Sequence, residues 1–258
     1  MDFSGYLGEI ERLRPERVPE NLVLLPVVDS TNRIARAIVQ EYETEEQPLP
    51  PLLILAFEQS GGRGRQGRTW TSPPGKGVYA TRVLTVQDAS VLQTLPLLVG
   101  VGLCRALAPL VPSSCRLKWP NDLLVEGKKI GGILIEAMVH TEGESRALIG
   151  FGVNVQQEPE EMPETATSVR RLGGTGSLED VTWGLVEGLE RELEHLGDLA
   201  YASAAYRELS IHRPGDRIVC RVGESTVEGA FVEIDDQGRL VLDTGNSGLR
   251  LSSGEVMG

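Results

Sequence analysis

One loop of the chain concentrates positive charge among glycine residues. No acidic residue occurs between Gln59 and Gln87, and residues 61–70 read GGRGRQGRTW. The cations of this stretch are Arg63, Arg65, Arg68, Lys76 and Arg82. Arginine presents a planar, permanently charged fork that binds phosphate and carboxylate groups, and glycine lets a ligand approach the backbone closely. We therefore expect the loop over 60–77 to hold an anionic substrate and close over it, with a solvated basic turn as the less favoured alternative.

This loop is not one of the common nucleotide-binding motifs. Gly62, Gly64 and Gly67 have the spacing of the dinucleotide-binding fingerprint, which requires a helix directly after the glycines. The sequence that follows, TWTSPPG over 69–75, cannot begin a regular helix. The two Gly-Lys pairs of the chain lack the upstream glycine and the following Ser or Thr of a P-loop. We exclude both motifs.

A second group of polar residues surrounds a proline. Residues 118–122 read KWPND, and Lys129 begins the apolar run KIGGIL a few residues later. Proline interrupts a strand, and Asn121 and Asp122 beside it suit a turn that displays polar side chains. Gly131-Gly132 inside a strand indicates close approach of another backbone or a ligand. A plain hairpin with a solvated lysine and a glycine bulge explains these residues equally well.

These segments lie among predicted strands and helices of an α+β domain. A capping box at 177–180 opens one predicted helix, and Asp29 to Asn32 suits another helix start, which is followed by an acidic loop over 41–51. Short turns between neighbouring strands favour antiparallel pairing, so we expect a mixed, mostly antiparallel sheet with helices on one side. The predicted strands span 22–28, 52–57, 78–85, 115–119, 122–125, 130–139 and 146–155, and the further predicted helices span 91–110, 178–196 and a stretch after Gly197.

The character of the chain changes near residue 210. Residues 212–258 contain short strands separated by turns, which is typical of a small β-barrel. A barrel of this size needs to pack against a larger domain to be stable. We therefore divide the chain into a catalytic domain over 1–209 and a barrel over 210–258. Residues 212–258 contain 5 Arg against 8 Asp and Glu, which disfavours an RNA-binding face.

Composition excludes several classes of protein. The 258 residues have a formal net charge of −12, which repels phosphate backbones, so we expect no nucleic-acid partner. The 3 cysteines form no spaced pair, and His140, His195 and His212 lie far apart, so neither a disulfide framework nor a zinc site is expected. The uncharged run over 91–104 is too short to span a bilayer. We expect a soluble, cytoplasmic protein without a membrane partner.

Four motifs together are similar, in order and rough spacing, to those of biotin protein ligases. They are DSTN over 29–32, GRGRQGR over 62–68, KWPND over 118–122 and KIGG over 129–132. Asn154 in GFGVNV and the tripeptide GEV over 254–256 match as well. The chain resembles bacterial biotin–carboxyl-carrier ligases over nearly its whole length. The short N-terminal segment indicates the form without a helix-turn-helix domain.

The resemblance implies a fold, a reaction and its substrates. The fold is a class II synthetase-like catalytic domain followed by an SH3-like barrel. The carboxylate of biotin attacks the α-phosphate of ATP, with Mg²⁺ assisting, and biotinyl-5′-AMP and pyrophosphate form. A lysine of a biotin carboxyl carrier protein then takes the biotinyl group. No protein nucleophile is needed, so catalysis rests on positioning and charge stabilisation.

The resemblance also implies roles for individual residues. Lys129 and Arg65 stabilise charge at the α-phosphate and the carboxylate, and Asp122 positions or deprotonates the incoming lysine. Biotin contacts are implied for Ser30, Thr31, Asn32, Gln59, Arg63, Gly64, Arg65, Lys129, Gly131 and Gly132. ATP contacts are implied for Arg63, Arg65, Arg68, Trp70, Asn121, Lys129 and Asn154, with magnesium arriving on the nucleotide rather than at a protein metal site.

Other functions remain open beside that of a biotin protein ligase. A lipoate or octanoate ligase or transferase shares the catalytic fold, although the glycine/arginine loop and the C-terminal barrel favour biotin. A non-catalytic biotin or nucleotide sensor is a rival from another class, which the retained Lys129 and loop arginines disfavour. Gln66 stands where relatives commonly have arginine, which removes one charge from the loop. A homodimer through an exposed sheet edge is an additional expectation.

Overall fold

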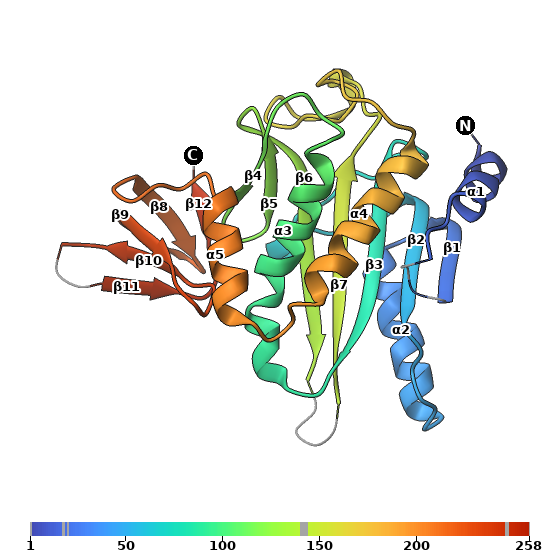
Figure 1. Cartoon of the computed structure of the whole chain (residues 1–258), viewed down its shortest axis with the longest axis horizontal. Helices are drawn as coiled ribbons and strands as arrows, with labels where there is room; N and C mark the ends of the chain where they lie inside the picture. The colour runs from blue at the N-terminus through green and yellow to red at the C-terminus, as the bar shows by residue number, and fades with distance from the viewer. Residues whose placement is uncertain (1, 17–18, 20, 140–143, 246–247, 258) are drawn as a thin grey trace.

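Seven strands form the larger of two sheets (Figure 1). The computed structural model describes residues 2–16, 19, 21–139, 144–245 and 248–257. The strand order is β1-β2-β3-β7-β6-β5-β4, with β1 and β2 parallel and every other neighbouring pair antiparallel. The strands are β1 (Asn21–Val28), β2 (Leu52–Gln59), β3 (Gly77–Val86), β4 (Cys115–Lys118), β5 (Asp122–Val125), β6 (Lys128–Met138) and β7 (Ser145–Asn154). The expected mixed, mostly antiparallel sheet is confirmed.

Helices α1 (Phe3–Arg12), α3 (Leu95–Leu107) and α4 (Leu178–Leu193) cover one face of this sheet, where α3 and α4 cross the strands in Figure 1. The two central helices approach closely because each has a glycine at the crossing. A Cβ on Gly102 would lie 2.6 Å from the Gly188 carbonyl, and a Cβ on Gly188 would lie 2.7 Å from the Gly102 carbonyl. The capping box at Ser177 is present as expected.

The opposite face of the sheet is covered by α2 (Thr31–Thr44) over only part of its area. Ala35 and Val39 of α2 pack on Leu52, Ile54 and other side chains of that face. The expectation of helices on one side therefore holds for α1, α3 and α4, whereas α2 lies on the other side. The physical reason is that β2 is buried on both faces, so its alternating apolar side chains need a cover on each.

Other element boundaries differ from the sequence expectation by a turn or less. Helix α2 continues to Thr44, into the segment expected to be a loop, and α3 starts at Leu95 after a short 3-10 turn, η2 (Ala89–Gln93). Helix α1 was not expected at all. The turn between β5 and β6 has positive φ at Glu126 and Gly127. No helix in the described part of the chain is both long and apolar enough to cross a membrane.

The C-terminal part forms a second, five-stranded antiparallel sheet in the order β11-β10-β9-β8-β12. Its strands are β8 (Arg217–Val222), β9 (Ser225–Ile234), β10 (Leu240–Asp243), β11 (Gly248–Leu251) and β12 (Glu255–Met257). The expected small β domain is thus present. Among the described residues β11 and β12 are the edges of this sheet, so backbone hydrogen bonds do not close it into a complete barrel. The boundary at residue 210 stays a prediction.

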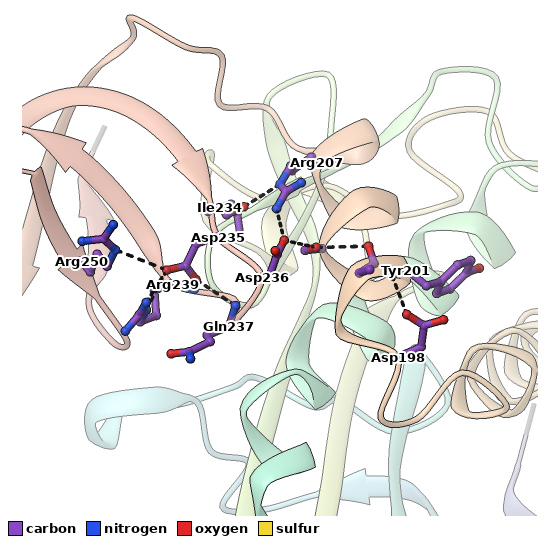
Figure 2. A network of polar contacts seen from close by, with 11 residues as sticks. Asp198, Tyr201, Arg207, Ile234, Asp235, Asp236, Gln237, Arg239 and Arg250 are labelled. Carbon is purple, nitrogen blue, oxygen red and sulfur yellow. Dashed lines mark hydrogen bonds and ion pairs between the residues drawn. The ribbon is translucent and has the colours of Figure 1, made fainter.

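Helix α5 (Leu199–Leu209) joins the two parts of the molecule (Figure 2). The Arg207 guanidinium donates to the Ile234 carbonyl at 2.6 Å and lies 2.7 Å from the Asp236 carboxylate. The Ser203 hydroxyl donates to the same carboxylate at 3.0 Å. A further contact between the two sheets comes from the Trp119 indole, which donates to the Gly238 carbonyl at 3.0 Å. These contacts fix the C-terminal sheet beside the KWPND turn.

The turn after β9 should make the stability of the C-terminal sheet depend on pH. Burial raises the pKa of Asp235, but hydrogen bonds from the Arg239 side chain and backbone and from the Gln237 amide outweigh burial and hold this pKa below its usual value (Figure 2). A lowered folded-state pKa contributes stability that is present above the unfolded pKa, about 4, and is lost as pH falls through the folded pKa.

We therefore expect Asp235→Asn to destabilise the protein near neutral pH. The difference in unfolding free energy from the unsubstituted protein should shrink as pH falls below about 4. Urea unfolding at a series of pH values measures that difference. A difference independent of pH would refute the assignment.

Candidate functional site

Glycines on β7 open the face that α2 leaves uncovered. Leu148, Gly150, Gly152 and Asn154 share one face of β7 because side chains alternate along a strand. Leu148 lies in the cluster under α2, and the two glycines line a cavity. A Cβ on Gly150 would lie 2.3 Å from Asn32 Oδ1, and a Cβ on Gly152 would lie 2.6 Å from the Trp70 indole nitrogen. The glycines therefore make room for two of the expected site residues.

The first turn of α2 supplies a buried polar network at the floor of this cavity. The Asn32 amide nitrogen donates to the Leu134 carbonyl at 3.2 Å and to the Glu136 carboxylate at 2.9 Å. The Thr81 hydroxyl lies 2.6 Å from Asn32 Oδ1 and 2.9 Å from the Thr31 hydroxyl. Each amide and hydroxyl orientation follows from these partners. Such a fixed set of donors and acceptors suits a rigid polar ligand.

Gln59 connects this network to the glycine/arginine loop. Its Oε1 accepts from the Thr31 amide at 2.9 Å, and its Nε2 donates to the Ser72 hydroxyl at 2.9 Å. Ser30 is the N-cap of α2, yet its side chain makes no capping hydrogen bond, and it also lines the cavity. Its hydroxyl is therefore not committed to the helix.

The glycine/arginine loop is a short backbone ladder. The Trp70 amide donates to the Gly62 carbonyl at 2.9 Å, and the Gly64 amide donates to the Arg68 carbonyl at 2.8 Å. A single 3-10 turn, η1 (Arg65–Gly67), forms its tip, with Gln66 in the left-handed region at φ 57°. Through these hydrogen bonds the loop folds back on itself, and Arg63, Arg65 and Arg68 lie at the rim of the cavity.

Each loop arginine at the rim has an internal partner. Arg63 lies 3.7 Å from the Glu136 carboxylate, and Arg68 forms an ion pair with Glu255 of β12. Arg65 donates to Asn121 Oδ1 at 3.2 Å and to the Gly254 carbonyl at 3.3 Å. The C-terminal sheet therefore contributes to the rim.

The electrostatics of these arginines differ. Burial lowers the pKa of Arg65, although the carboxylates of Asp122 and Glu255 oppose this shift. The hydrogen bond from Arg68 lowers the pKa of Glu255 and raises that of Arg68 itself. Arginine keeps its charge throughout. The rim therefore presents cations whose present partners an anionic ligand would replace.

Lys129 lies at the centre of the site. Its Nζ is 2.6 Å from Asp122 Oδ1 and 5.5 Å from the centre of the Trp70 ring. Its backbone is fixed on both sides, because the Lys129 amide donates to the Thr165 carbonyl and the Thr167 amide donates to the Lys129 carbonyl, each at 2.9 Å. Two cavities meet here, since both are lined by Thr69, Trp70 and Lys129.

The structure brings most of the expected site residues together. The first cavity is lined by Ser30, Thr31, Asn32, Gln59, Arg63, Gly64, Arg65, Arg68, Trp70, Asn121, Asp122, Lys129 and Gly132. Asn154 lines the second cavity, together with Gln157, Glu161 and Met162 among others. Gly131 lines neither cavity, and a Cβ on Gly131 would point at β7, 2.9 Å from the Gly152 carbonyl and 3.1 Å from the Val153 side chain. Of the Gly131-Gly132 pair, only Gly132 faces the site.

Three polar residues that we did not single out also shape the site: Thr81, Glu136 and Gln157. The signal for Thr81 and Glu136 was strand alternation, since Glu136 follows Gly132 and Leu134 at spacings of two residues. Gln157 follows the strand and had no sequence signal. Among the described residues, no group of three or more His, Cys, Asp or Glu side chains is placed to hold a metal ion, and His140 lies outside those residues.

Comparison with known proteins places the chain in a family. A model described as the biotin/lipoate A/B protein ligase family matches residues 24–154, and a biotin protein ligase C-terminal domain matches residues 217–257. The chain belongs to the biotin/lipoate A/B protein ligase family. The matched residues of this family contain the polar floor, the glycine/arginine loop, Lys129 and Asn154.

Family members that are similar to this chain include enzymes and a solved complex. The biotin–[acetyl-CoA-carboxylase] ligase of Mycobacterium tuberculosis is 33% identical, over 80% of this chain and 78% of the relative. The bifunctional ligase/repressor BirA of Bacillus subtilis is 28% identical, over 95% of this chain and 77% of the relative. The biotin protein ligase from Aquifex aeolicus in complex with biotin and ATP has a TM-score of 0.72 and 26% identity, over 92% of this chain and 98% of that one. The expected fold class and family are confirmed.

Proposed function

We propose that the chain is an ATP-dependent ligase that activates biotin as biotinyl-5′-AMP and transfers the biotinyl group to a lysine of a carrier protein. The observation that carries this proposal is the meeting of two cavities at Lys129 and Trp70. A carboxylate held in one cavity and a nucleotide held in the other would meet beside a cation. The similarity to biotin ligases supports this assignment.

In the first step, an oxygen of the biotin carboxylate attacks the α-phosphorus of ATP. The bond from that phosphorus to the bridging oxygen breaks, so pyrophosphate leaves and a mixed anhydride remains. Negative charge builds on the phosphoryl oxygens during this displacement. Lys129 and Arg65 would stabilise this charge, and Arg68 would hold the departing pyrophosphate, because fixed cations in a desolvated site are effective there. Mg²⁺ enters as part of the nucleotide substrate, with its coordination shared between phosphates and water.

The polar floor is suited to the ureido ring of biotin. This ring offers two N–H donors and one carbonyl acceptor, which must all find partners when the ring is buried. Ser30, Thr31 and Gln59 line the cavity with hydroxyl and amide groups, and Asn32 is locked in one orientation beside them. Gly64 and Arg63 at the rim would bind the carboxylate end of the ligand.

In the second step, the amine of the acceptor lysine attacks the acyl carbon and AMP leaves. The attacking nitrogen must lose a proton for the amide to form. Asp122 would accept or orient that proton, since its carboxylate lines the cavity beside Lys129. The carrier is a protein with a biotin-accepting domain.

Asp122→Asn should separate the two steps. We expect the transfer of biotin from preformed biotinyl-AMP to slow by about 10²-fold, whereas adenylation changes by a few-fold only. Single-turnover transfer to a carrier domain and ATP–pyrophosphate exchange measure the two steps. Glu126→Gln, in the exposed turn before β6, is the matched control. An equal loss in both steps would remove Asp122 from the proton-transfer role.

The complete reaction is tested with a carrier domain that has one acceptor lysine. Incubation with the protein, biotin and MgATP should add one biotinyl group to that lysine, as detected by mass spectrometry, and a carrier with arginine at that position should remain unmodified. An unmodified lysine in the first mixture would contradict the proposed function. The match of residues 217–257 to a biotin protein ligase domain favours biotin over lipoate or octanoate.

Two finer expectations complete the proposal. Strand β1 is an edge of the larger sheet and exposes 55% of Val27, which supports a homodimer through this edge. Light scattering of the purified protein checks the oligomeric state. A cytoplasmic location, where biotin, ATP and the carrier would meet, also stays a prediction.

A further inference from the structure

The hydrogen bonds of the polar floor have a defined direction, which begins at the Glu136 carboxylate. A carboxylate and a backbone carbonyl only accept hydrogen bonds. The Asn32 nitrogen must therefore face Glu136 Oε2, at 2.9 Å, and the Leu134 carbonyl, at 3.2 Å. Asn32 Oδ1 then faces the opposite way, toward Thr81. The Asn32 amide is thus fixed in one of its two possible orientations.

The Thr81 hydroxyl connects Asn32 to Thr31 and determines the direction of the next hydrogen bond. Thr81 Oγ1 lies 2.6 Å from Asn32 Oδ1 and 2.9 Å from Thr31 Oγ1. A hydroxyl has one proton, which can serve only one of these two contacts. Because Asn32 Oδ1 cannot donate, the Thr81 proton must point at Asn32. The contact with Thr31 then needs the proton of the Thr31 hydroxyl, which donates to Thr81 Oγ1.

The second contact of the Thr31 hydroxyl is consistent with this direction. Gln59 Oε1 lies 3.2 Å from Thr31 Oγ1, but this oxygen already accepts from the Thr31 amide at 2.9 Å. It therefore does not require the hydroxyl proton. Thr31 lines the first cavity, and a hydroxyl whose proton is directed at Thr81 has only lone pairs left for a ligand. This part of the floor is suited to a ligand that donates through N–H.

We propose that Thr81 is a positioning residue whose hydroxyl makes Thr31 a hydrogen-bond acceptor, and that the floor thereby selects ligands with an N–H group in the buried ring. The inference rests on the proposed function, which places the ureido ring of biotin on this floor. Thr81 is 0% exposed and lines neither cavity, so it acts through Thr31 and not by touching the ligand. Without the Thr81 hydroxyl, the Thr31 proton loses its fixed acceptor and Thr31 can present either a proton or a lone pair.

The test compares two ligands that differ in the N–H groups of the ring. Dethiobiotin keeps the ureido ring without the sulfur, and its cyclic carbonate analogue has ring oxygens in place of both N–H groups. Titration calorimetry should show that the unsubstituted protein binds dethiobiotin at least about a hundredfold more tightly, because the analogue leaves buried acceptors unpaired. In Thr81→Ala this ratio of affinities should fall about tenfold. Thr81→Ser, which keeps the hydroxyl, should retain the ratio of the unsubstituted protein.

Thr85→Ala is the matched control, because Thr85 lies on the same face of β3 and lines neither cavity. It should keep the full ratio. A merely structural role of Thr81 would weaken the binding of both ligands in parallel and leave their ratio unchanged, which would overturn the inference. If Thr81→Ala does not fold, Thr81→Val replaces it, since valine fills the same space without the hydroxyl.

Two further results separate this inference from the proposed function. Equal binding of dethiobiotin and the carbonate by the unsubstituted protein would overturn the inference and leave the proposed function standing. Absence of binding of biotin itself would contradict the proposed function, and the inference would fall with it.

Discussion

Lys129→Ala should lower kcat/KM for biotin adenylation by about 10²–10³-fold, which is the largest effect expected from a single substitution here. The reason is the position of its ammonium group where the two cavities meet, 2.6 Å from Asp122. Removing this cation would delete the charge that we propose to act on the reacting phosphate, and it would leave the Asp122 carboxylate without its ion-pair partner. ATP–pyrophosphate exchange with biotin measures the loss.

Two further variants make this expectation specific. Lys128→Ala removes the adjacent lysine, which lines neither cavity, and should leave the exchange rate almost unchanged. Lys129→Ala combined with Asp122→Asn removes the unbalanced carboxylate. If Lys129 stabilises the phosphoryl group directly, this double variant stays slow. Recovery of the full rate in the double variant would show that Lys129 only neutralises Asp122.

Gly150→Ala should raise the KM for biotin about tenfold or more, because overpacking at this position displaces the polar floor. A Cβ at this position would lie 2.3 Å from Asn32 Oδ1 and 2.9 Å from the Leu134 carbonyl. Asn32 would have to move, and its contacts with Thr81 and Glu136 would break. The KM for ATP should change much less, since neither Gly150 nor Asn32 lines the second cavity, where the nucleotide is proposed to bind.

Gly184→Ala is the control for the glycine substitution. Gly184 lies within α4, and a Cβ there would meet nothing within 4 Å. Alanine is favoured over glycine in a helix, so this variant should be slightly more stable and keep the KM for biotin. Steady-state kinetics with biotin varied at saturating ATP distinguish the two variants. An unchanged KM for biotin in Gly150→Ala would show that Asn32 does not shape the biotin site.

Much of the fold could be predicted because its strands are bounded by strong turn signals. The Ser177 capping box appears where the sequence places it, and the predicted strands over 115–119 and 122–125 are present as β4 and β5. Helix α1 was missed although Phe3, Tyr6 and Ile10 recur at helical spacing and the Asp2 side chain caps the Gly5 amide at 2.9 Å. Charged residues between these positions obscure the periodicity in the sequence. In the structure, Tyr6 and Ile10 of this helix are buried in the core beneath the larger sheet.

The candidate site also contains residues that the sequence predicts and residues that it does not. Motif residues such as Lys129 and Arg65 could be selected from sequence, because their residue types and spacing indicate phosphate chemistry. Glu136 and Gln157 could not, because their importance depends on partners from distant parts of the chain. Glu136 contacts Asn32, which lies 104 residues earlier in the chain. Gln157 is defined by a hydrogen-bond chain that ends on Thr167. Such contacts exist only after the sheet has formed.

The central claim is that this site adenylates biotin, and ATP–pyrophosphate exchange tests it most directly. Purified protein would be assayed with biotin, lipoate, octanoate or no acid. We expect exchange with biotin alone, at a rate that Lys129→Ala strongly reduces. Exchange that depends on lipoate or octanoate, or no exchange with any acid in a folded sample, would contradict the account.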